Sequence, residues 1–353
     1  VNAGNSIASG GNYNTVVGDE AGTDLTTGDN NVFVGYATGD VINTGLNNVA
    51  VGMAALSSDT KGQDNVAIGH QSLFTQNFTS ATSSYNVAVG KNAGFALTTG
   101  TLNTLIGGLA GDAITTASNN TAVGYVSLSG NTTGANNVAV GANALQPNTT
   151  GASNTAIGKG ALASNTTASN NTAVGFESLV SNTTGTRNVA LGASALDANT
   201  VGGKNVALGM DALGTNVDGS RSVAVGDSAL AAQDPASAVE MYNTAVGHAA
   251  GTAVTTGIYN NLIGGLAGDA LTTGSSNAVL GYSALSSDTE GNHSIAIGYQ
   301  ALTAQNFATA TNVYNVAIGT SAGAAVTTGV QNTLIGGLAG DALTDADANV
   351  AVG

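Results

Sequence analysis

A five-residue motif of the form Asn-Val-Ala-Val-Gly recurs at a fixed spacing along the whole chain. Of the 19 intervals between its closing glycines, 16 are 17 residues long and the other three are 21 residues long. A fixed period of this length is the signature of a solenoid, in which each repeat forms one coil that stacks on its neighbours. No linker interrupts the repeat, so we predict a single repeat domain over residues 1–353. The closing glycines are Gly18, Gly35, Gly52, Gly69, Gly90, Gly107, Gly124, Gly141, Gly158, Gly175, Gly192, Gly209, Gly226, Gly247, Gly264, Gly281, Gly298, Gly319, Gly336 and Gly353.

Each motif predicts a short strand. The residue before the closing glycine is Val, Ile or Leu in all 20 copies, mostly Val or Thr stands two residues earlier, and Ala usually lies between them. Such apolar residues at i and i+2 indicate a strand with one buried face, which we expect to carry these Val and Ile side chains. The glycine ends the strand where the backbone takes a positive φ or passes close to a neighbour. Asn stands four residues before it in 18 of 20 copies, where amides can form ladders between coils.

The rest of the repeat has two versions. In eleven copies a Leu lies four residues after the glycine, whereas in eight that residue is Gly and an apolar residue follows three positions later. Each coil thereby keeps one large apolar residue on its second side. We therefore predict two short strands per coil and an all-β parallel solenoid of about twenty coils, three of them with 21 residues.

Charge and composition exclude several classes of protein. The net charge is −15, and the six basic residues lie far apart along the chain, so we predict no basic patch and no nucleic-acid binding. Cysteine is absent, and no apolar stretch is long enough for a membrane-spanning helix. The chain starts without Met or a signal peptide, so we expect a fragment or a processed chain. The basic residues are Lys61, Lys91, Lys159, Arg187, Lys204 and Arg221.

A single chain of this kind has a small core. Only about three large apolar residues per coil are expected to face inward, and neither a disulfide nor an evident metal site compensates for this. Several copies that bury a shared apolar face around one axis would supply the missing core. We therefore expect a homo-oligomer.

The repeat resembles the head repeats of YadA-like trimeric autotransporter adhesins. The resemblance rests on Asn137–Gly141 and Ser294–Gly298 and extends over residues 18–353. It implies a left-handed parallel β-roll in each chain, a homotrimer, an extracellular location at the cell surface and an adhesive role. From the residues themselves we predict no enzymatic activity and no cofactor.

The chain departs from that family in two respects. The family's usual head repeat is shorter, so a 17-residue coil implies a longer outer turn. No heptad stalk and no membrane anchor is found in the sequence. Similar repeats occur in shafts of phage tail fibres, so a virion tail fibre is the first alternative. The second is an ice- or crystal-binding solenoid with Thr-Thr-Gly turns, although adjacent threonines in a strand point to opposite faces.

The three 21-residue coils are the best candidates for ligand binding. Because the strands stay in phase on both sides, their four extra residues must bulge outward, and exposed aromatic loops on a rigid scaffold are typical binding sites. The alternative is that the tyrosines, each five residues before a closing glycine, only fix the longer turn. The candidate residues are Phe74, Phe78, Tyr85, Tyr242, Phe307 and Tyr314.

Other residues give weaker signals. His70, His248 and His293 lie in separate coils, and we interpret them as surface residues and predict no metal site. No Ser or Thr has a His and an acid at a spacing that suggests a catalytic triad, so we predict no catalytic residues. The segment Gly-Gly-Leu-Ala-Gly-Asp-Ala lacks the Lys of a phosphate loop and points to duplicated blocks of coils. Asn-Thr-Thr sites such as Asn131 and Asn148 are formal glycosylation sites.

Overall fold

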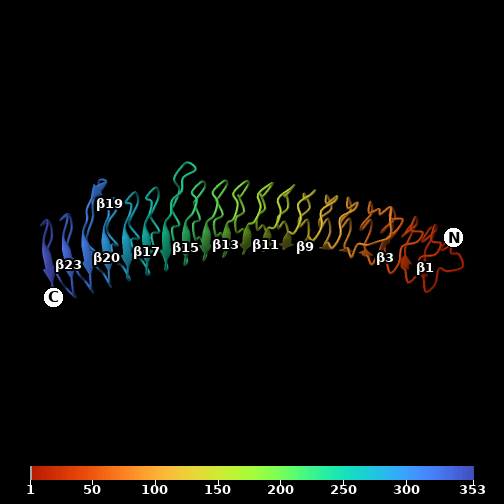
Figure 1. Cartoon of the computed structure of the whole chain (residues 1–353), viewed down its shortest axis with the longest axis horizontal. Helices are drawn as coiled ribbons and strands as arrows, with labels where there is room; N and C mark the ends of the chain where they lie inside the picture. The colour runs from red at the N-terminus through yellow and green to blue at the C-terminus, as the bar shows by residue number, and fades with distance from the viewer. Residues whose placement is uncertain (1) are drawn as a thin grey trace. The chain divides into compact units, whose positions relative to one another are not determined.

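The computed structural model describes residues 2–353 and contains strands and turns without a helix in that range. It therefore holds no helix that could cross a membrane among these residues. The chain divides into two compact units, one ending at Asn171 and the other running from Thr172 to Gly353. The single domain expected over residues 1–353 stays a prediction. In each unit the short strands lie side by side and the turns extend away from them (Figure 1).

In both units strands of three residues pair in parallel with the strand one coil away. Val138 pairs with Thr155 in the first unit, for example, and Val206 with Val223 in the second. The predicted all-β parallel solenoid of about twenty 17-residue coils is confirmed.

The first unit contains β1 (Thr15–Val17), β2 (Val32–Val34), β3 (Val49–Val51), β4 (Gly62–Gln63), β5 (Val66–Ile68), β6 (Thr82–Ser83), β7 (Val87–Val89), β8 (Thr104–Ile106), β9 (Thr121–Val123), β10 (Val138–Val140) and β11 (Thr155–Ile157). The second contains β12 (Thr172–Val174), β13 (Val189–Leu191), β14 (Val206–Leu208), β15 (Val223–Val225), β16 (Thr244–Val246), β17 (Asn261–Ile263), β18 (Ala278–Leu280), β19 (Gly291–Asn292), β20 (Ile295–Ile297), β21 (Thr311–Asn312), β22 (Val316–Ile318), β23 (Thr333–Ile335) and β24 (Val350–Val352). The two-residue strands pair only with each other, β4 with β6 and β19 with β21.

The second strand predicted for each coil forms in only four coils of residues 2–353, as the two-residue strands β4, β6, β19 and β21, and in the other coils turns and bends follow the closing glycine. In the coil after Gly124, Val126 and Leu128 have φ values of 49° and 54°. A left-handed conformation costs a non-glycine residue about 1–2 kcal/mol. Leu128 is nevertheless fully buried, so the burial of its side chain offsets that cost. The predicted large apolar residue on the second side of the coil is thus present, but on a turn.

The expected burial of the strand side chains is inverted. Ala139, in the middle of β10, is fully buried, whereas its neighbours Val138 and Val140 are only partly buried and face outward. The interior of a coil is already occupied by residues such as Leu145 and by a row of asparagines, so it has room for a methyl group. Hydrophobicity alone assigns the larger side chains to the inside, and the width of the coil reverses that assignment.

The closing glycines have the predicted role. Gly141 has a φ of 130°, and a Cβ atom there would lie 2.6 Å from the carbonyl oxygen of Gly158 in the next coil. Any side chain at this place would collide with backbone rather than with a movable side chain. The strand-to-turn corner therefore requires glycine for both its conformation and its close packing.

The predicted asparagine ladder is confirmed. The backbone N–H of Asn137 donates to Oδ1 of Asn120 over 3.0 Å, and its Nδ2 donates to the carbonyl of Gly151 over 2.9 Å. Asn131 and Asn148 belong to a second ladder, in which Nδ2 of Asn148 donates to Oδ1 of Asn131 over 2.7 Å. Both side chains are fully buried. They are therefore inaccessible for glycosylation in the folded chain.

Candidate functional site

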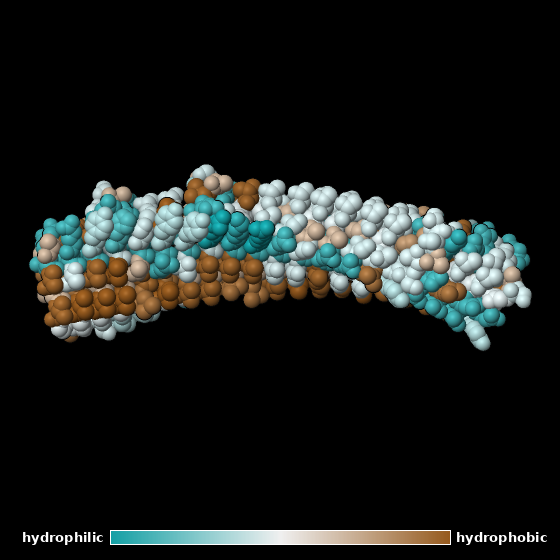
Figure 2. All heavy atoms as spheres, viewed as in Figure 1, coloured by the Kyte–Doolittle hydropathy of each residue, from teal (hydrophilic) through white to brown (hydrophobic). Residues whose placement is uncertain are grey.

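The outward side chains of the strands form an apolar surface. Ile106 and Ile157 in the first unit, and Leu191, Ile263 and Leu280 in the second, are each 38–49% exposed. No charged residue occupies either outward strand position within residues 2–353. Figure 2 shows this surface as a hydrophobic band along the strands of the second unit.

The inserted residues of the 21-residue coils do bulge outward, as predicted, since residues 79–81, 236–240 and 308–310 are exposed. The aromatic rings beside them behave differently. Phe78 and Phe307 are only 7% and 8% exposed, and so are not presented to solvent as expected. Phe74 is partly buried and stacks on Phe95, with ring centroids 5.2 Å apart.

A buried glutamine holds each long coil from the inside. Gln76 donates to Oδ2 of Asp59 over 2.7 Å and accepts a hydrogen bond from Nδ2 of Asn86 over 2.8 Å. Gln233 and Gln305 make corresponding bonds to the next asparagine. Gln stands seven residues after the closing glycine in the three long coils and in no other, a signal that the sequence analysis missed.

The tyrosines of the long coils are exposed and occupy the same place in their coils. Tyr85, Tyr242 and Tyr314 are 42–55% exposed, and all occupy the place five residues before the closing glycine. Tyr242 stacks on Tyr259 one coil later, with centroids 5.7 Å apart, and Tyr314 stacks on His293 over 5.1 Å. The rings of Tyr242 and Tyr314 are thus accessible to solvent and also packed on an aromatic ring of a neighbouring coil. The ligand-binding role of the six aromatic residues stays a prediction.

Basic residues occupy this place in consecutive coils of the second unit and form a column there, which corrects the expectation that they are scattered. Arg187, Lys204 and Arg221 follow one another at the 17-residue period and lie in consecutive coils. The backbone N–H of Lys204 donates to Thr186, and that of Arg221 donates to Gly203, which fixes the coils in register. The sequence does contain a signal for this clustering, because the three residues are spaced by one full repeat of 17 residues. Their distance along the chain made them look unrelated.

The column ends in a small network of charges. The Arg221 guanidinium forms a 2.6 Å ion pair with Glu240 and lies 5.5 Å from the centre of the Tyr242 ring. The Tyr242 hydroxyl donates to Glu240 over 2.7 Å. Hydrogen bonds from Tyr242 and then from Arg221 lower the pKa of the Glu240 carboxyl, so this group is ionised at neutral pH.

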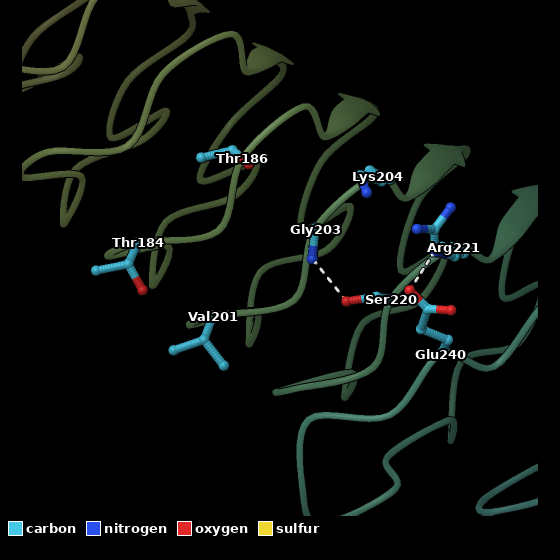
Figure 3. A pocket seen from close by; sticks show the side chains of 8 residues that line it. All are labelled: Thr184, Thr186, Val201, Gly203, Lys204, Ser220, Arg221 and Glu240. Carbon is cyan, nitrogen blue, oxygen red and sulfur yellow. Dashed lines mark hydrogen bonds and ion pairs between the residues drawn. The ribbon is translucent and has the colours of Figure 1, made fainter.

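A hollow of about 200 Å³ lies beside these residues (Figure 3). Its lining comes from consecutive coils of the second unit and includes Thr186, Gly203, Lys204, Ser220 and Arg221. Gly203 lines the hollow without a side chain of its own. Neighbouring coils carry Thr186 and Ser220 at the same place.

The three histidines have different surroundings. His248 lies 3.5 Å from Asp227, His293 stacks on Tyr314, and His70 follows a closing glycine in the first unit. No group of three residues that could hold a metal ion is found within residues 2–353.

The adjacent threonines lie in a bend rather than in a strand, and they differ in their hydrogen bonds. Thr149 donates to the carbonyl of Thr166 over 3.0 Å, whereas Thr150 is exposed. In this turn one exposed threonine thus bonds the next coil.

Comparison of the sequence with models of protein families and with curated proteins finds no match. A function for this chain is therefore proposed from its fold and from the surfaces described above.

Proposed function

We propose that the chain forms a homotrimeric, extracellular fibre with an adhesive role, similar to the heads of YadA-like trimeric autotransporter adhesins. The observation that carries the proposal is the apolar outer face of the strands. Side chains such as Ile106, Ile157, Ile263 and Leu280 leave it exposed to water in a single chain. Exposed apolar surface of this extent marks an interaction site.

Two further copies of the same chain are the occupants that fit this face. Its strand positions carry no charge, whereas the rest of a chain with net charge −15 repels its own copies. The face repeats with the period of the coil, so identical chains in parallel would match it coil for coil. A trimer is the assembly that the resemblance implies, and it would cover the face on all three chains.

The adhesive and extracellular parts of the proposal rest on the resemblance to the adhesin heads and on the repetition of the turns along the chain. The outward turns present the same positions in coil after coil, and three chains would present them three times over. Weak contacts multiplied in this way give strong attachment without a deep binding pocket. The proposal is thus one of structure and binding rather than of catalysis.

The solution mass tests the proposal. Light scattering should give about 102 kDa, which is three times the 34.0 kDa chain. Ile263→Glu, which buries a charge in the proposed interface, should shift the mass towards one chain. Val239→Glu is the matched control, because Val239 has similar exposure but lies in an outward loop. A wild-type mass of 34.0 kDa at every concentration would contradict the trimer.

A further inference from the structure

Three of the chain's six basic residues are brought together in the second unit. Arg187, Lys204 and Arg221 each have a φ of 60–63°, the left-handed conformation that this corner of the coil adopts. Coils stack about 4.8 Å apart, so the three cations span roughly 10 Å. A chain with net charge −15 therefore carries one compact column of positive charge in this unit.

Two of these cations form no direct ion pair within residues 2–353, although Lys204 is close enough to the Glu240 carboxylate to help lower its pKa. Arg221 is paired with Glu240, but neither Arg187 nor Lys204 forms an ion pair with any residue in the range 2–353. Both side chains are exposed. Unpaired cations beside each other repel, and an anion bound between them would remove that repulsion.

The hollow beside the column offers hydroxyl groups as well as charge. Ser220 Oγ accepts a hydrogen bond from the backbone N–H of Gly203 over 3.0 Å, which leaves its own O–H free to donate outward. Thr184 and Thr186 line the same hollow and are exposed. Glu240, at the edge, adds an acceptor (Figure 3). Lys204 and Arg221 are the cations that line this hollow of about 200 Å³, and Arg187 stands at the equivalent place one coil before Lys204, outside the lining. Cations, hydroxyl donors and an acceptor placed together in this way match a ligand that carries both an acidic group and hydroxyls.

The geometry points to the acidic group of a saccharide. We propose that Arg187, Lys204 and the hollow between Thr186 and Ser220 bind a carboxylated or sulfated sugar of a glycan. The acidic group would lie between the two unpaired cations, and the sugar hydroxyls would bond Ser220, Thr186 and Glu240.

The same features disfavour nucleic acid. The column of cations gives way to Tyr242 in the next coil, so a long polyanion would make only a few phosphate contacts. Single-stranded nucleic acid also needs open aromatic faces on which bases stack. The Tyr242 ring is already occupied by neighbours, since its centre lies 5.5 Å from the Arg221 guanidinium in the coil before it and 5.7 Å from the Tyr259 ring in the coil after it.

The test is a binding titration with the purified full chain. The probes are 3′-sialyllactose for the carboxylate, a heparin tetrasaccharide for the sulfate, and lactose as the neutral sugar. At least one acidic probe should bind, more weakly as salt is added, and lactose should not. Arg187→Gln with Lys204→Gln should weaken that binding by about tenfold or more, since each charged hydrogen bond contributes on that order. The two acidic probes distinguish the carboxylate from the sulfate.

The matched control is Lys61→Gln with Lys91→Gln, which makes the same change of net charge in the first unit and should bind like the wild type. Equal binding by both double variants, binding of lactose as tight as that of the acidic sugars, or no binding of either acidic probe would overturn the proposal. So would tighter binding of a short oligodeoxythymidine. The site lies within one chain, and both double variants should keep the wild-type mass, so its failure is distinct from failure of the trimer.

Discussion

Side-chain volume is balanced between neighbouring coils. Leu105 takes the central strand place that is alanine in most coils, and the turns on either side then carry Gly94 and Gly111 instead of leucine. A Cβ atom at either glycine would lie 2.8 Å from a Leu105 methyl group. The two versions of the repeat thus fill the same interior volume in two ways, with the large side chain either on the strand or on the turn. The same arrangement surrounds Phe33, with Gly22 and Gly39, Leu262, with Gly251 and Gly268, and Leu334, with Gly323 and Gly340.

Two buried aspartates make stability depend on pH. Burial raises the pKa of the Asp59 and Asp288 carboxyls, and hydrogen bonds from Gln76 and Gln305 lower it only in part. A folded-state pKa above the unfolded value near 3.9 means that the stability these groups contribute is complete below that pH. It is lost as the pH rises through the raised folded-state pKa.

We predict that the free energy of unfolding has a component that falls as the pH rises above about 4, by at most about 1.4 kcal/mol per pH unit for each group. Asp59→Asn with Asp288→Asn should remove this component. The double variant should be less stable, because an amide NH₂ group in place of Asp59 Oδ2 cannot accept the hydrogen bond that Gln76 Nε2 donates, although Oδ1 would still accept the backbone N–H groups of Gly62 and Phe78. Denaturant unfolding across pH measures both effects. A variant with the same pH slope as the wild type would contradict the assignment.

At the level of the coil, side-chain ladders do the work that a second strand was expected to do. The segment after the closing glycine is made of turns, which leave backbone carbonyls inside the coil. Asn148 donates to the carbonyl of Gly151 over 2.8 Å and accepts a hydrogen bond from Asn165 over 2.8 Å. Each such amide therefore joins one turn to the next coil and satisfies a buried carbonyl.

Asn148→Ala should destabilise the chain by about 2–3 kcal/mol, because it leaves the amide of Asn165 and the carbonyl of Gly151 without this partner. Thr150→Ala is the control. Thr150 is exposed in the same turn, and its loss should change stability by no more than about 0.5 kcal/mol. Urea unfolding of both variants decides the matter, and equal midpoints would show that the ladder contributes little.

At the scale of the whole molecule, the inverted burial of the strands leaves an apolar surface that one chain cannot cover. The core of each coil contains alanines, one larger apolar residue and buried amides, while much of the Val, Ile and Leu surface of the strands faces water. A chain built in this way gains stability by association.

We therefore predict that the melting temperature rises with protein concentration, because unfolding is coupled to dissociation of the trimer. Scanning calorimetry over a wide range of concentrations measures the shift. Ile263→Glu should abolish the dependence and Val239→Glu should retain it. A wild-type melting temperature that is independent of concentration would indicate a self-sufficient monomer.

Repetition allowed the sequence by itself to determine the coil. A residue type that recurs with the period of the coil must meet the same neighbours in every coil. The closing glycines, the asparagine ladder, the parallel register and the buried leucines could therefore be predicted before any coordinates. The outward bulge of the long coils could also be predicted, because the strand motifs on both sides of each insertion keep the same place in the coil.

Tertiary structure decided which face of each strand is inside and which residues meet on the surface. Alternation divides a strand into two faces, but only the narrow interior of the coil selects alanine over Val and Ile for the inside. The burial of Phe78 and Phe307 likewise belongs to the folded coil, where the backbone N–H group of each donates to the buried Asp59 or Asp288 carboxyl. Arg187, Lys204 and Arg221 are distant in the chain, and stacking of the coils makes them neighbours, since one full turn of the solenoid separates each from the next.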